Sequence, residues 1–274
     1  MIKINLNGKE LETKAKSLFQ LVSEYIEEDS YCIEDYVLIL NGFQISEDFK
    51  LNLNDKVVII KKGTMVNEEE FESMVSARST PGVYNTIKNS KVAIAGLGGL
   101  GSNIAIMLSR IGVGNLLLVD FDVIEPSNLN RQQYLIKDLG KYKTDALKET
   151  ISQINPFINV KIRTTKVSED NVEELFKEYD IACEAFDKAD QKAMLINNLS
   201  LKLPNIKIVS ASGLAGFESS NSIKTKKSMN NIYICGDLEN EAKHFNGLMA
   251  PRVTVCASHQ ANMVLRLLLG IDEP

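Results

Sequence analysis

Four closely spaced glycines follow a short apolar run near the middle of the chain, and this spacing is typical of a phosphate-binding turn. The run spans residues 92–95, and the glycines are Gly96, Gly98, Gly99 and Gly101. Because glycine lacks a side chain, backbone N–H groups can approach phosphate oxygens, and a helix over residues 102–111 would add a partial positive charge at its start. The spacing therefore predicts a strand, a phosphate-binding turn and a helix.

A carboxylate follows the next predicted strand. A second apolar run, residues 116–119, ends at Asp120, about 20 residues past the glycines, where dinucleotide-binding folds place an acid on ribose hydroxyls. Hydride-transferring enzymes and other nucleotide-binding proteins share this arrangement, so these residues alone leave the chemistry open.

Further polar residues favour phosphate chemistry over hydride transfer. They gather directly after the second run, and two more come later in the chain: Asp120, Asp122, Asn128, Arg131 and Gln132, then Lys143 and Asp187. If residues 181–187 form a strand that ends at the same sheet edge, Asp187 joins the cluster. Cations and carboxylates together suit a triphosphate better than a nicotinamide.

Four motifs in this order resemble one family. GLGGLGS, DFDVIEPSNLNRQ, the lysine that ends Gly140-Lys-Tyr-Lys143, and Phe186-Asp187 are similar to the adenylating domain shared by ThiF, MoeB and the ubiquitin-activating enzymes. The resemblance covers roughly residues 70–270, and LMAPR with CASHQAN resembles a bacterial branch of the ThiF group. It implies ATP and Mg²⁺ as cosubstrates, and activation of the C-terminal glycine carboxylate of a ubiquitin-like protein as an acyl-adenylate.

The resemblance also implies a role for each polar residue. Asp120 would accept ribose hydroxyls, Lys143 would contact the phosphates and Asp187 would hold Mg²⁺, with Lys141 as a possible substitute for Lys143. Asp122 would face the metal or the attacking tail, or else serve as a turn residue. The others would line the ribose and phosphate pocket: Asn128, which could instead shape a turn, Arg131 and Gln132.

An arginine before this domain implies a dimer. Arg78 occupies the place where ThiF-like enzymes carry an arginine that reaches the ATP site of the partner subunit. We therefore expect a homodimer in which Arg78 acts in trans. The alternative is an ordinary surface or capping arginine.

The N-terminal part resembles a ubiquitin-like carrier. Strands predicted over residues 2–6, 10–13, 36–40 and 57–60, with a helix over 17–28, give a ββαββ order similar to the ubiquitin-like fold of ThiS. A carrier needs a free Gly-Gly end, whereas this chain continues through Gly63, so we expect a retained, non-conjugating module.

These observations together predict the domain organisation. We expect a small α+β ubiquitin-like (β-grasp) domain over residues 1–64, a helical connection over 65–80 and an ATP-binding adenylating domain over 81–274. The adenylating domain is expected to be α/β, with a Rossmann-like mixed or parallel sheet.

Composition limits the remaining possibilities. The chain has 274 residues, 44% of them hydrophobic, a formal net charge of −5, no evident signal peptide and no apolar run of membrane-spanning length. We therefore expect a cytoplasmic protein without membrane or nucleic-acid partners. The four cysteines stand singly, so no structural zinc is expected. Cys235 is either a sulfur-handling residue or, more in keeping with free cysteines, a buried thiol.

Three functions are consistent with the sequence. The first is adenylation of a ThiS-like carrier for thiazole and thiamine biosynthesis. The second is adenylation of another acceptor, either a molybdopterin carrier or a carboxylate on modified tRNA. The third is an inactive nucleotide-binding regulator that uses its ubiquitin-like domain for assembly.

Overall fold

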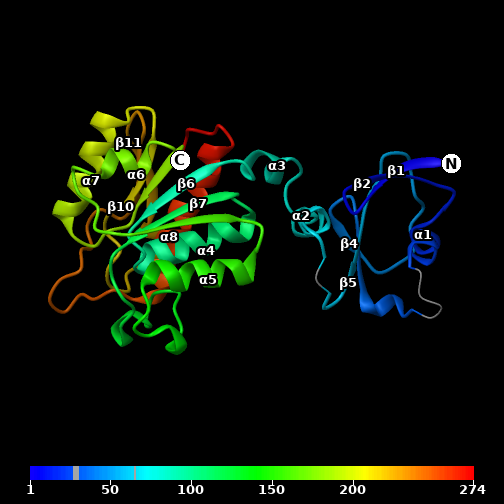
Figure 1. Cartoon of the computed structure of the whole chain (residues 1–274), viewed down its shortest axis with the longest axis horizontal. Helices are drawn as coiled ribbons and strands as arrows, with labels where there is room; N and C mark the ends of the chain where they lie inside the picture. The colour runs from blue at the N-terminus through cyan, green and yellow to red at the C-terminus, as the bar shows by residue number, and fades with distance from the viewer. Residues whose placement is uncertain (27–30, 65) are drawn as a thin grey trace. The chain divides into compact units, whose positions relative to one another are not determined.

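The chain folds into two compact units. The computed structural model describes residues 1–26, 31–64 and 66–274, and the contacts divide the chain into Met1–Val83 and Tyr84–Pro274 (Figure 1). Each unit has a hydrophobic core of its own. Within the described residues, none of the helices combines the length and the apolar character needed to span a bilayer.

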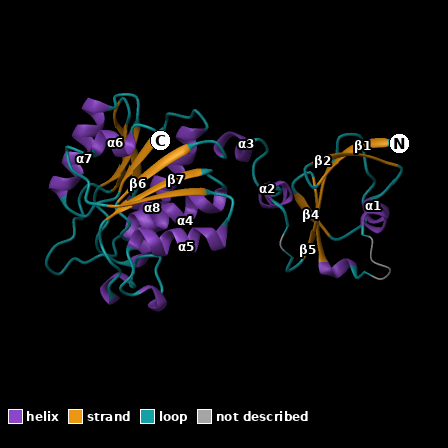
Figure 2. Cartoon of the chain, in the orientation of Figure 1, coloured by secondary structure: helices purple, strands orange, loops and turns teal. Residues whose placement is uncertain are grey.

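The first unit is built on a five-stranded sheet, against which helices pack (Figure 2). The strand order is β2-β1-β5-β3-β4, and the pairing of β1 with β5 is parallel while the other pairings are antiparallel. The elements are β1 (Ile2–Leu6), β2 (Lys9–Thr13), α1 (Leu18–Tyr25), a 3₁₀ helix (Ile33–Asp35), β3 (Tyr36–Leu40), β4 (Phe43–Ile45), β5 (Lys56–Lys61) and α2 (Glu68–Ser76).

Helix α1 has the cap and the spacing that its sequence predicts. Ser17 caps it by accepting a hydrogen bond from the N–H of Gln20, and Leu18, Leu21 and Val22 are fully buried against the sheet. Burial of each such side chain contributes about 2 kcal/mol. The helix was predicted to run to residue 28; α1 ends at Tyr25, and residues 27–30 lie outside the described part of the chain.

The predicted ββαββ order omitted one strand. Asn41 and Gly42 both have positive φ and join β3 to β4, a three-residue strand on the sheet edge. An Asn-Gly pair is the strongest short hairpin signal, and the same pair at Asn7-Gly8 joins β1 to β2. The strand was missed because it is very short and has an exposed Phe43 in place of an apolar run.

Helix α2 follows the ubiquitin-like sheet and packs on it. Asn67 caps the helix by accepting from the N–H of Glu70. A Cβ at Gly8 would lie 3.4 Å from the Ser73 Cβ, and one at Gly42 would lie 3.4 Å from the carbonyl oxygen of Ala77. The chain beyond Gly63 therefore folds back along both hairpin turns of the first unit.

The second unit is a seven-stranded α/β fold. Its elements begin with α3 at the boundary between the units: α3 (Val83–Ile87), β6 (Lys91–Ala95), α4 (Gly99–Ile111), β7 (Asn115–Asp120), two 3₁₀ helices (Pro126–Asn128 and Ile136–Asp138), α5 (Lys143–Ile154), β8 (Asn159–Thr164), α6 (Val172–Phe176), β9 (Ile181–Glu184), α7 (Ala189–Lys202), β10 (Lys207–Ala211), a 3₁₀ helix (Ser220–Ser222), β11 (Lys224–Met229), β12 (Ile232–Gly236) and α8 (Ala250–Leu268).

The sheet is largely parallel and covered on both faces. Its order is β11-β12-β10-β9-β6-β7-β8, and only β11 runs antiparallel to its neighbour. Helices α4, α5 and α8 lie on one face, and α6 and α7 lie on the other (Figures 1 and 2). The predicted fold, a Rossmann-like mixed sheet preceded by a β-grasp domain, is confirmed.

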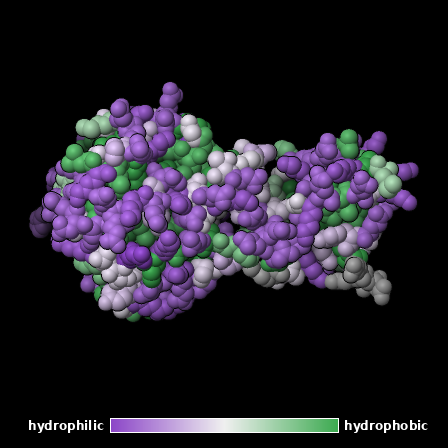
Figure 3. Space-filling view, turned by 45° about the horizontal axis from the view of Figure 1, so that its top comes forward, coloured by the Kyte–Doolittle hydropathy of each residue, from purple (hydrophilic) through white to green (hydrophobic). Residues whose placement is uncertain are grey.

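Apolar side chains of the strands supply the core of this unit. Ala93 and Ala95 face the layer of α6 and α7, where Phe176 and Leu195 are fully buried. Hydrophilic residues cover most of the visible surface in Figure 3, as expected for a chain with 24% charged residues. Buried charged groups are therefore the exceptions that call for a reason.

Candidate functional site

The strand order reverses between β6 and β9, and the candidate site lies where these two strands end. From β6 the chain proceeds outward through β7 and β8, and then returns to place β9 on the other side of β6. The N–H of Ala185 donates to the Ala95 carbonyl at 2.9 Å, so the loops after β6 and β9 start side by side. Open α/β sheets bind ligands at such a reversal, beyond the carboxyl ends of the strands.

Two of the four predicted glycines are required by close packing of the turn. Gly96 has φ +89°, and a Cβ on it would lie 2.8 Å from the Ala185 carbonyl oxygen. A Cβ on Gly101 would lie 1.8 Å from the Gly96 carbonyl oxygen. Any side chain at either position would therefore displace the backbone of the turn.

The other two glycines adjoin polar side chains. A Cβ on Gly98 would meet only the Gln132 Nε2 atom, at 3.8 Å, and one on Gly99 would contact Val253 and the Arg131 stem. Helix α4 starts here, and no described side chain caps it at Gly98. Its first N–H groups can therefore donate to an anion.

Asp120 is fixed beside this turn at the end of β7. It is only 8% exposed, and its two carboxylate oxygens accept from the N–H of Leu97 at 2.6 Å and of Asp122 at 2.8 Å. Burial raises the pKa of Asp120, although Lys143 and the two backbone donors oppose the rise. Each oxygen retains a lone pair, so the carboxylate could also accept ribose hydroxyls.

A short antiparallel pairing after β7 brings Lys143 next to Asp120 and Asp122. Val123 pairs with Tyr142 in an antiparallel bridge, and the Lys143 N–H donates to the Asp122 carbonyl. The Lys143 Nζ then lies 2.8 Å from Asp122 Oδ2. Asp122, predicted to face the metal or the tail, is thus held by a buried lysine in this structure.

The structure separates the two candidate lysines. The Lys143 side chain is 7% exposed, and its charge influences Asp120. The Lys141 side chain is 40% exposed and pairs with Asp138 and Glu149. Contact with phosphate remains a prediction, and the geometry favours Lys143 for it.

The 3₁₀ helix Pro126–Asn128 and the residues after it bring polar side chains to the glycine turn. Asn128 accepts from the Glu125 N–H at 3.0 Å, so it shapes the turn, as its alternative interpretation predicted. Arg131 donates to the Ser127 carbonyl, but its Nε atom is buried without a partner, and so is the Oε1 atom of the buried Gln132. An unmet buried polar atom costs about 1–3 kcal/mol, and a bound ligand would satisfy it.

Asp187 follows the end of β9 as an exposed residue. Within the described chain, no hydrogen bond or ion pair engages its side chain, and no group of three or more His, Cys, Asp or Glu side chains is arranged to hold a metal ion. Magnesium usually takes one or two carboxylates together with substrate phosphates. A single free carboxylate at this edge fits that requirement.

Two further residues singled out in the sequence lie in the first unit and in the core of the second. Arg78 follows α2 in the first unit and is exposed, so its action in trans stays a prediction. Cys235, in β12, is fully buried, and burial raises its pKa to about 11. Cys256 is also buried, with a pKa of about 12. These thiols are held protonated, which agrees with the buried-thiol interpretation of Cys235.

Sequence reasoning missed a second set of buried polar residues at this edge. Arg252, at the start of α8, pairs with Asp237 and donates to the carbonyls of Glu218 and Ser219. Glu184 ends β9 as a fully buried carboxylate. The signal for Glu184 was a charged residue inside an apolar strand.

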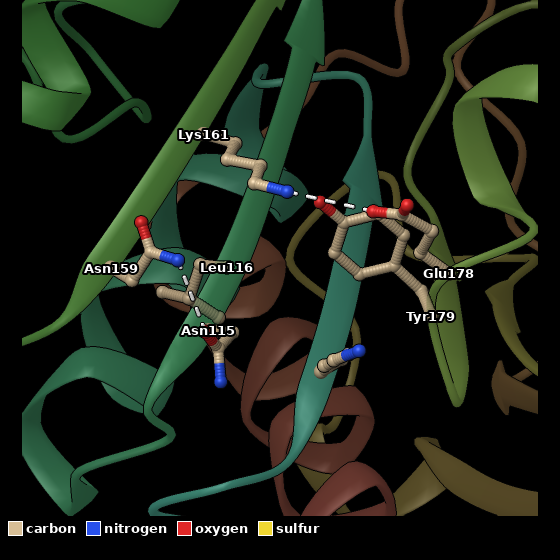
Figure 4. Close-up of a pocket in the computed structure, with 7 residues that line it drawn as sticks. Asn115, Leu116, Asn159, Lys161, Glu178 and Tyr179 are labelled. Atoms are coloured by element: carbon tan, nitrogen blue, oxygen red, sulfur yellow. Dashed lines mark hydrogen bonds and ion pairs between the residues drawn. The ribbon is translucent and has the colours of Figure 1, made fainter.

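Two cavities of the second unit lie elsewhere. One, of about 40 Å³, is at the amino ends of the strands, where Lys161 and Glu178 approach to 3.5 Å; its lining is Lys91, Asn115, Leu116, Asn159, Lys161, Glu178 and Tyr179 (Figure 4). A hollow of about 430 Å³ adjoins the start of β10 and the turn between β11 and β12. The first is too small for a nucleotide, and neither is lined by the predicted site residues.

Comparison with known proteins identifies both units. Residues 73–274 match the model of the ThiF family, and residues 2–63 match the ThiS-like ubiquitin model. The probable adenylyltransferase/sulfurtransferase MoeZ of Mycobacterium tuberculosis is 37% identical over 102 residues, covering 37% of this chain and 26% of MoeZ. The adenylyltransferase and sulfurtransferase UBA4 of Eremothecium gossypii is 30% identical over 194 residues, covering 68% of this chain and 43% of UBA4.

Solved structures share the fold of the second unit. Escherichia coli tRNA N6-threonylcarbamoyladenosine dehydratase, TcdA, solved in complex with ATP, is 20% identical with a TM-score of 0.66, covering 76% of this chain and 98% of TcdA. E. coli MccB with ATP is 23% identical with a TM-score of 0.57, covering 78% of this chain and 66% of MccB. The chain spans less than half the length of MoeZ or UBA4. With most of its length matched by one family model, the chain belongs to the ThiF family and carries a ThiS-like ubiquitin domain at its N-terminal side.

Proposed function

We propose that residues 81–274 bind ATP with Mg²⁺ and adenylate the C-terminal glycine carboxylate of a ThiS-like carrier protein in thiamine biosynthesis. The observation that carries the proposal is the buried Lys143, paired with Asp122, beside Asp120 and the glycine turn. The side chains of Arg131 and Gln132, each with one buried polar atom that has no partner, adjoin the same turn. The names of MoeZ and UBA4 as adenylyltransferases, and the ATP complexes of TcdA and MccB, support it.

The reaction needs charge neutralisation more than acid–base catalysis. A glycine carboxylate is ionised at neutral pH, so it attacks the α-phosphorus without a general base. The new bond joins a carboxylate oxygen to that phosphorus, and the bond to the bridging oxygen of the β-phosphate breaks, releasing pyrophosphate. Repulsion between the two anions amounts to about 4 kcal/mol per pair of charges about 4 Å apart at an effective dielectric constant of about 20.

The site residues supply this neutralisation. Donors at the start of α4 and the planar fork of Arg131 would bind phosphate oxygens. Lys143 would exchange Asp122 for phosphate, because the incoming triphosphate carries more negative charge. Asp120 would orient the ribose, with Asn128 and Gln132 beside it. Mg²⁺, held by Asp187 when bound, would offset further phosphate charge.

The first unit is proposed as a non-conjugating module. Its sheet matches the ThiS-like ubiquitin model, yet its chain continues past Gly63 into α2, which folds back on the hairpin turns. An internal peptide bond has no carboxylate to activate. The protein would therefore act on a separate carrier, as a homodimer in which Arg78 reaches the ATP site of the partner subunit.

A second acceptor class is supported by the comparisons. The name of TcdA refers to a modified tRNA, and other relatives are named molybdopterin-synthase adenylyltransferases, including that of Haemophilus influenzae at 35% identity over 130 residues. A molybdopterin carrier or a tRNA-linked carboxylate is the alternative substrate. The ThiS-like first unit favours a sulfur carrier.

Exchange of labelled pyrophosphate into ATP tests the reaction and the acceptor together. The purified chain is supplied with Mg²⁺ and, in separate reactions, a ThiS-like carrier, a molybdopterin carrier or modified tRNA; the control is each carrier without its last glycine. The proposal predicts exchange with the intact ThiS-like carrier only, and at least a hundredfold less after Asp187→Ala, about the effect of losing one preorganised transition-state contact. ATP binding without exchange for any acceptor would favour an inactive regulator.

A further inference from the structure

A carboxylate–lysine pair lies where β9 ends, with the carboxylate fully buried and the lysine side chain 21% exposed. Glu184 has no exposed surface, and its two oxygens lie 3.0 and 2.8 Å from the Lys192 Nζ. The Ser210 hydroxyl donates to Oε2 at 2.6 Å, and the N–H of Phe186 donates to Oε1 at 2.7 Å. Every strong acceptor position of this carboxylate is directed at a defined partner.

Stability alone is a weak reason for such a pair. Removing two charges from water costs several kcal/mol for each ion, and replacing a buried pair with apolar residues is often neutral or stabilising. Near by, Leu195 and Leu199 of the same helix are fully buried in an apolar core, so Lys192 could have been apolar. The question is what this pair holds in place.

The pair closes the loop that carries Asp187. Glu184 accepts from the N–H two residues ahead, at Phe186, which turns the chain as β9 ends. Lys192 lies in the first turns of α7, and its N–H donates to the Lys188 carbonyl. One anchor therefore lies three residues before Asp187 and the other lies five residues after it.

The turn at Ala185 and Phe186 packs closely against the glycine turn at Gly96. The Ala185 carbonyl oxygen and the Phe186 ring lie within 3.0 Å of where a Cβ on Gly96 would be. The Gln260 side chain, from α8, donates to the carbonyls of Glu184, in β9, and Val209, in β10. Hydrogen bonds therefore fix both the backbone of Glu184 and the turn that follows it.

We infer that Glu184 and Lys192 are positioning residues that hold Asp187 for the metal–nucleotide complex without touching it. This inference rests on the proposed function, in which Asp187 holds Mg²⁺. An exposed carboxylate on a loose loop would have to be ordered on binding, whereas the buried pair orders the loop in advance. Loss of the pair should therefore weaken binding only when the metal is present.

Calorimetric titration of ATP, once with Mg²⁺ and once with EDTA, separates the two effects. For Glu184→Gln we expect about tenfold weaker binding of ATP with Mg²⁺, because one charge-assisted anchor is lost, and less than about twofold change in EDTA. Lys192→Arg, which keeps the charge and the donors, should retain most of the affinity. Asp180→Asn is the matched control, because Asp180 accepts from the Lys91 N–H at the other end of β9.

A double variant tests whether the effect passes through Asp187. If it does, Glu184→Gln added to Asp187→Ala should cause no further loss of affinity with Mg²⁺. Ser210→Ala removes a single hydrogen bond and gives a milder version, about threefold, should Glu184→Gln fail to fold.

The outcomes distinguish this inference from the proposed function. Equal weakening with and without Mg²⁺, or additive losses in the double variant, would overturn the positioning role. If Asp187→Ala abolishes the benefit of Mg²⁺ while Glu184→Gln and Ser210→Ala leave it unchanged, only the inference fails. If Asp187→Ala leaves that benefit intact, the proposed metal role and the inference both fail.

Discussion

The two edges of the seven-stranded sheet differ in where they place charge. At the amino edge, Lys161 and Glu178 form an exposed pair 3.5 Å apart beside a small cavity (Figure 4). At the carboxyl edge, charged groups are buried and bonded to defined partners: Asp120, Lys143, Glu184, Asp237 and Arg252. The residues predicted for the site therefore lie at the edge with the buried charges, and neither cavity is lined by them.

The energetics explain why this difference is informative. Exposed ion pairs contribute about 0–1 kcal/mol to stability, so the loss of one changes the free energy of unfolding little. Buried charges cost several kcal/mol each unless they are fully paired. All four buried polar atoms without partners in the described chain belong to residues at or next to the carboxyl edge: Arg131, Gln132, Arg252 and Gln260. These are the atoms that the proposed nucleotide could satisfy.

The largest effect should come from the turn itself. Gly101→Ala places a Cβ 1.8 Å from the Gly96 carbonyl oxygen, so the first turn of α4 has to move. We expect the free energy of unfolding to fall by more than about 3 kcal/mol, because backbone cannot yield as a side chain does. Urea unfolding followed by circular dichroism measures it. Gly247→Ala is the control, since a Cβ there meets nothing within 4 Å; equal losses for both would contradict the packing argument.

The next largest effect should be on activity. Lys143→Met removes the buried cation beside Asp120 and Asp122, and pyrophosphate exchange should fall by about a hundredfold, the usual result of losing one preorganised charge contact. The neighbouring Lys141→Met should lower exchange by less than about threefold, because that lysine forms surface pairs. A greater loss of exchange for Lys141→Met than for Lys143→Met would assign the phosphate contact to Lys141 instead.

A smaller effect should appear in the acid stability of the carboxyl edge. Burial works against ionisation of Asp237, but N–H donors of Asn240 and Glu239 and the charge of Arg252 outweigh it and lower its pKa to about 2. Because this pKa lies below that of the unfolded chain, about 3.9, the stabilisation is complete above about pH 5 and is lost as the pH falls towards 2. It amounts to about 2 kcal/mol.

Unfolding measured between pH 5 and pH 2 checks this prediction. The native chain should lose stability over that range more steeply than Asp237→Asn, and the two should converge near pH 2. The amino edge provides the comparison, because Lys207 holds the pKa of the exposed Asp272 below its usual range. Asp272→Asn should change the slope less; a steeper change there would reverse the contrast between the edges.

The smallest effect belongs to the amino edge. Lys161→Met breaks the exposed pair with Glu178, and both ATP affinity and exchange should stay within about twofold, since such pairs contribute little. The free energy of unfolding should change by less than about 0.5 kcal/mol. A tenfold loss of ATP affinity would contradict the assignment of the nucleotide to the carboxyl edge.

Local signals made much of the fold predictable. Residues close in sequence determine the glycine turn, the strands beside it and the Asn7-Gly8 hairpin. Sequence periodicity and turn residues therefore indicate these elements directly. β4 was not predicted because three residues are too few to show a period. The Asn41-Gly42 pair was nevertheless a sequence signal for the hairpin.

The buried network could not be predicted in the same way. Ser210 and Gln260 reach Glu184 across 26 and 76 residues of sequence, and only the sheet order brings them together. The choice between Lys141 and Lys143 likewise depended on the bridge between Val123 and Tyr142, which no local pattern encodes. Roles that need a nucleotide or a second subunit, such as that of Arg78, remain predictions.

Titration of ATP in EDTA into the native chain, Lys143→Met and Lys161→Met tests the central claim most directly. If the nucleotide binds at the carboxyl edge, Lys143→Met should weaken binding by at least about tenfold, since a buried charge contact is lost. Lys161→Met should leave the affinity within about twofold. Unchanged affinity for Lys143→Met, together with a loss for Lys161→Met, would contradict the assignment of the site.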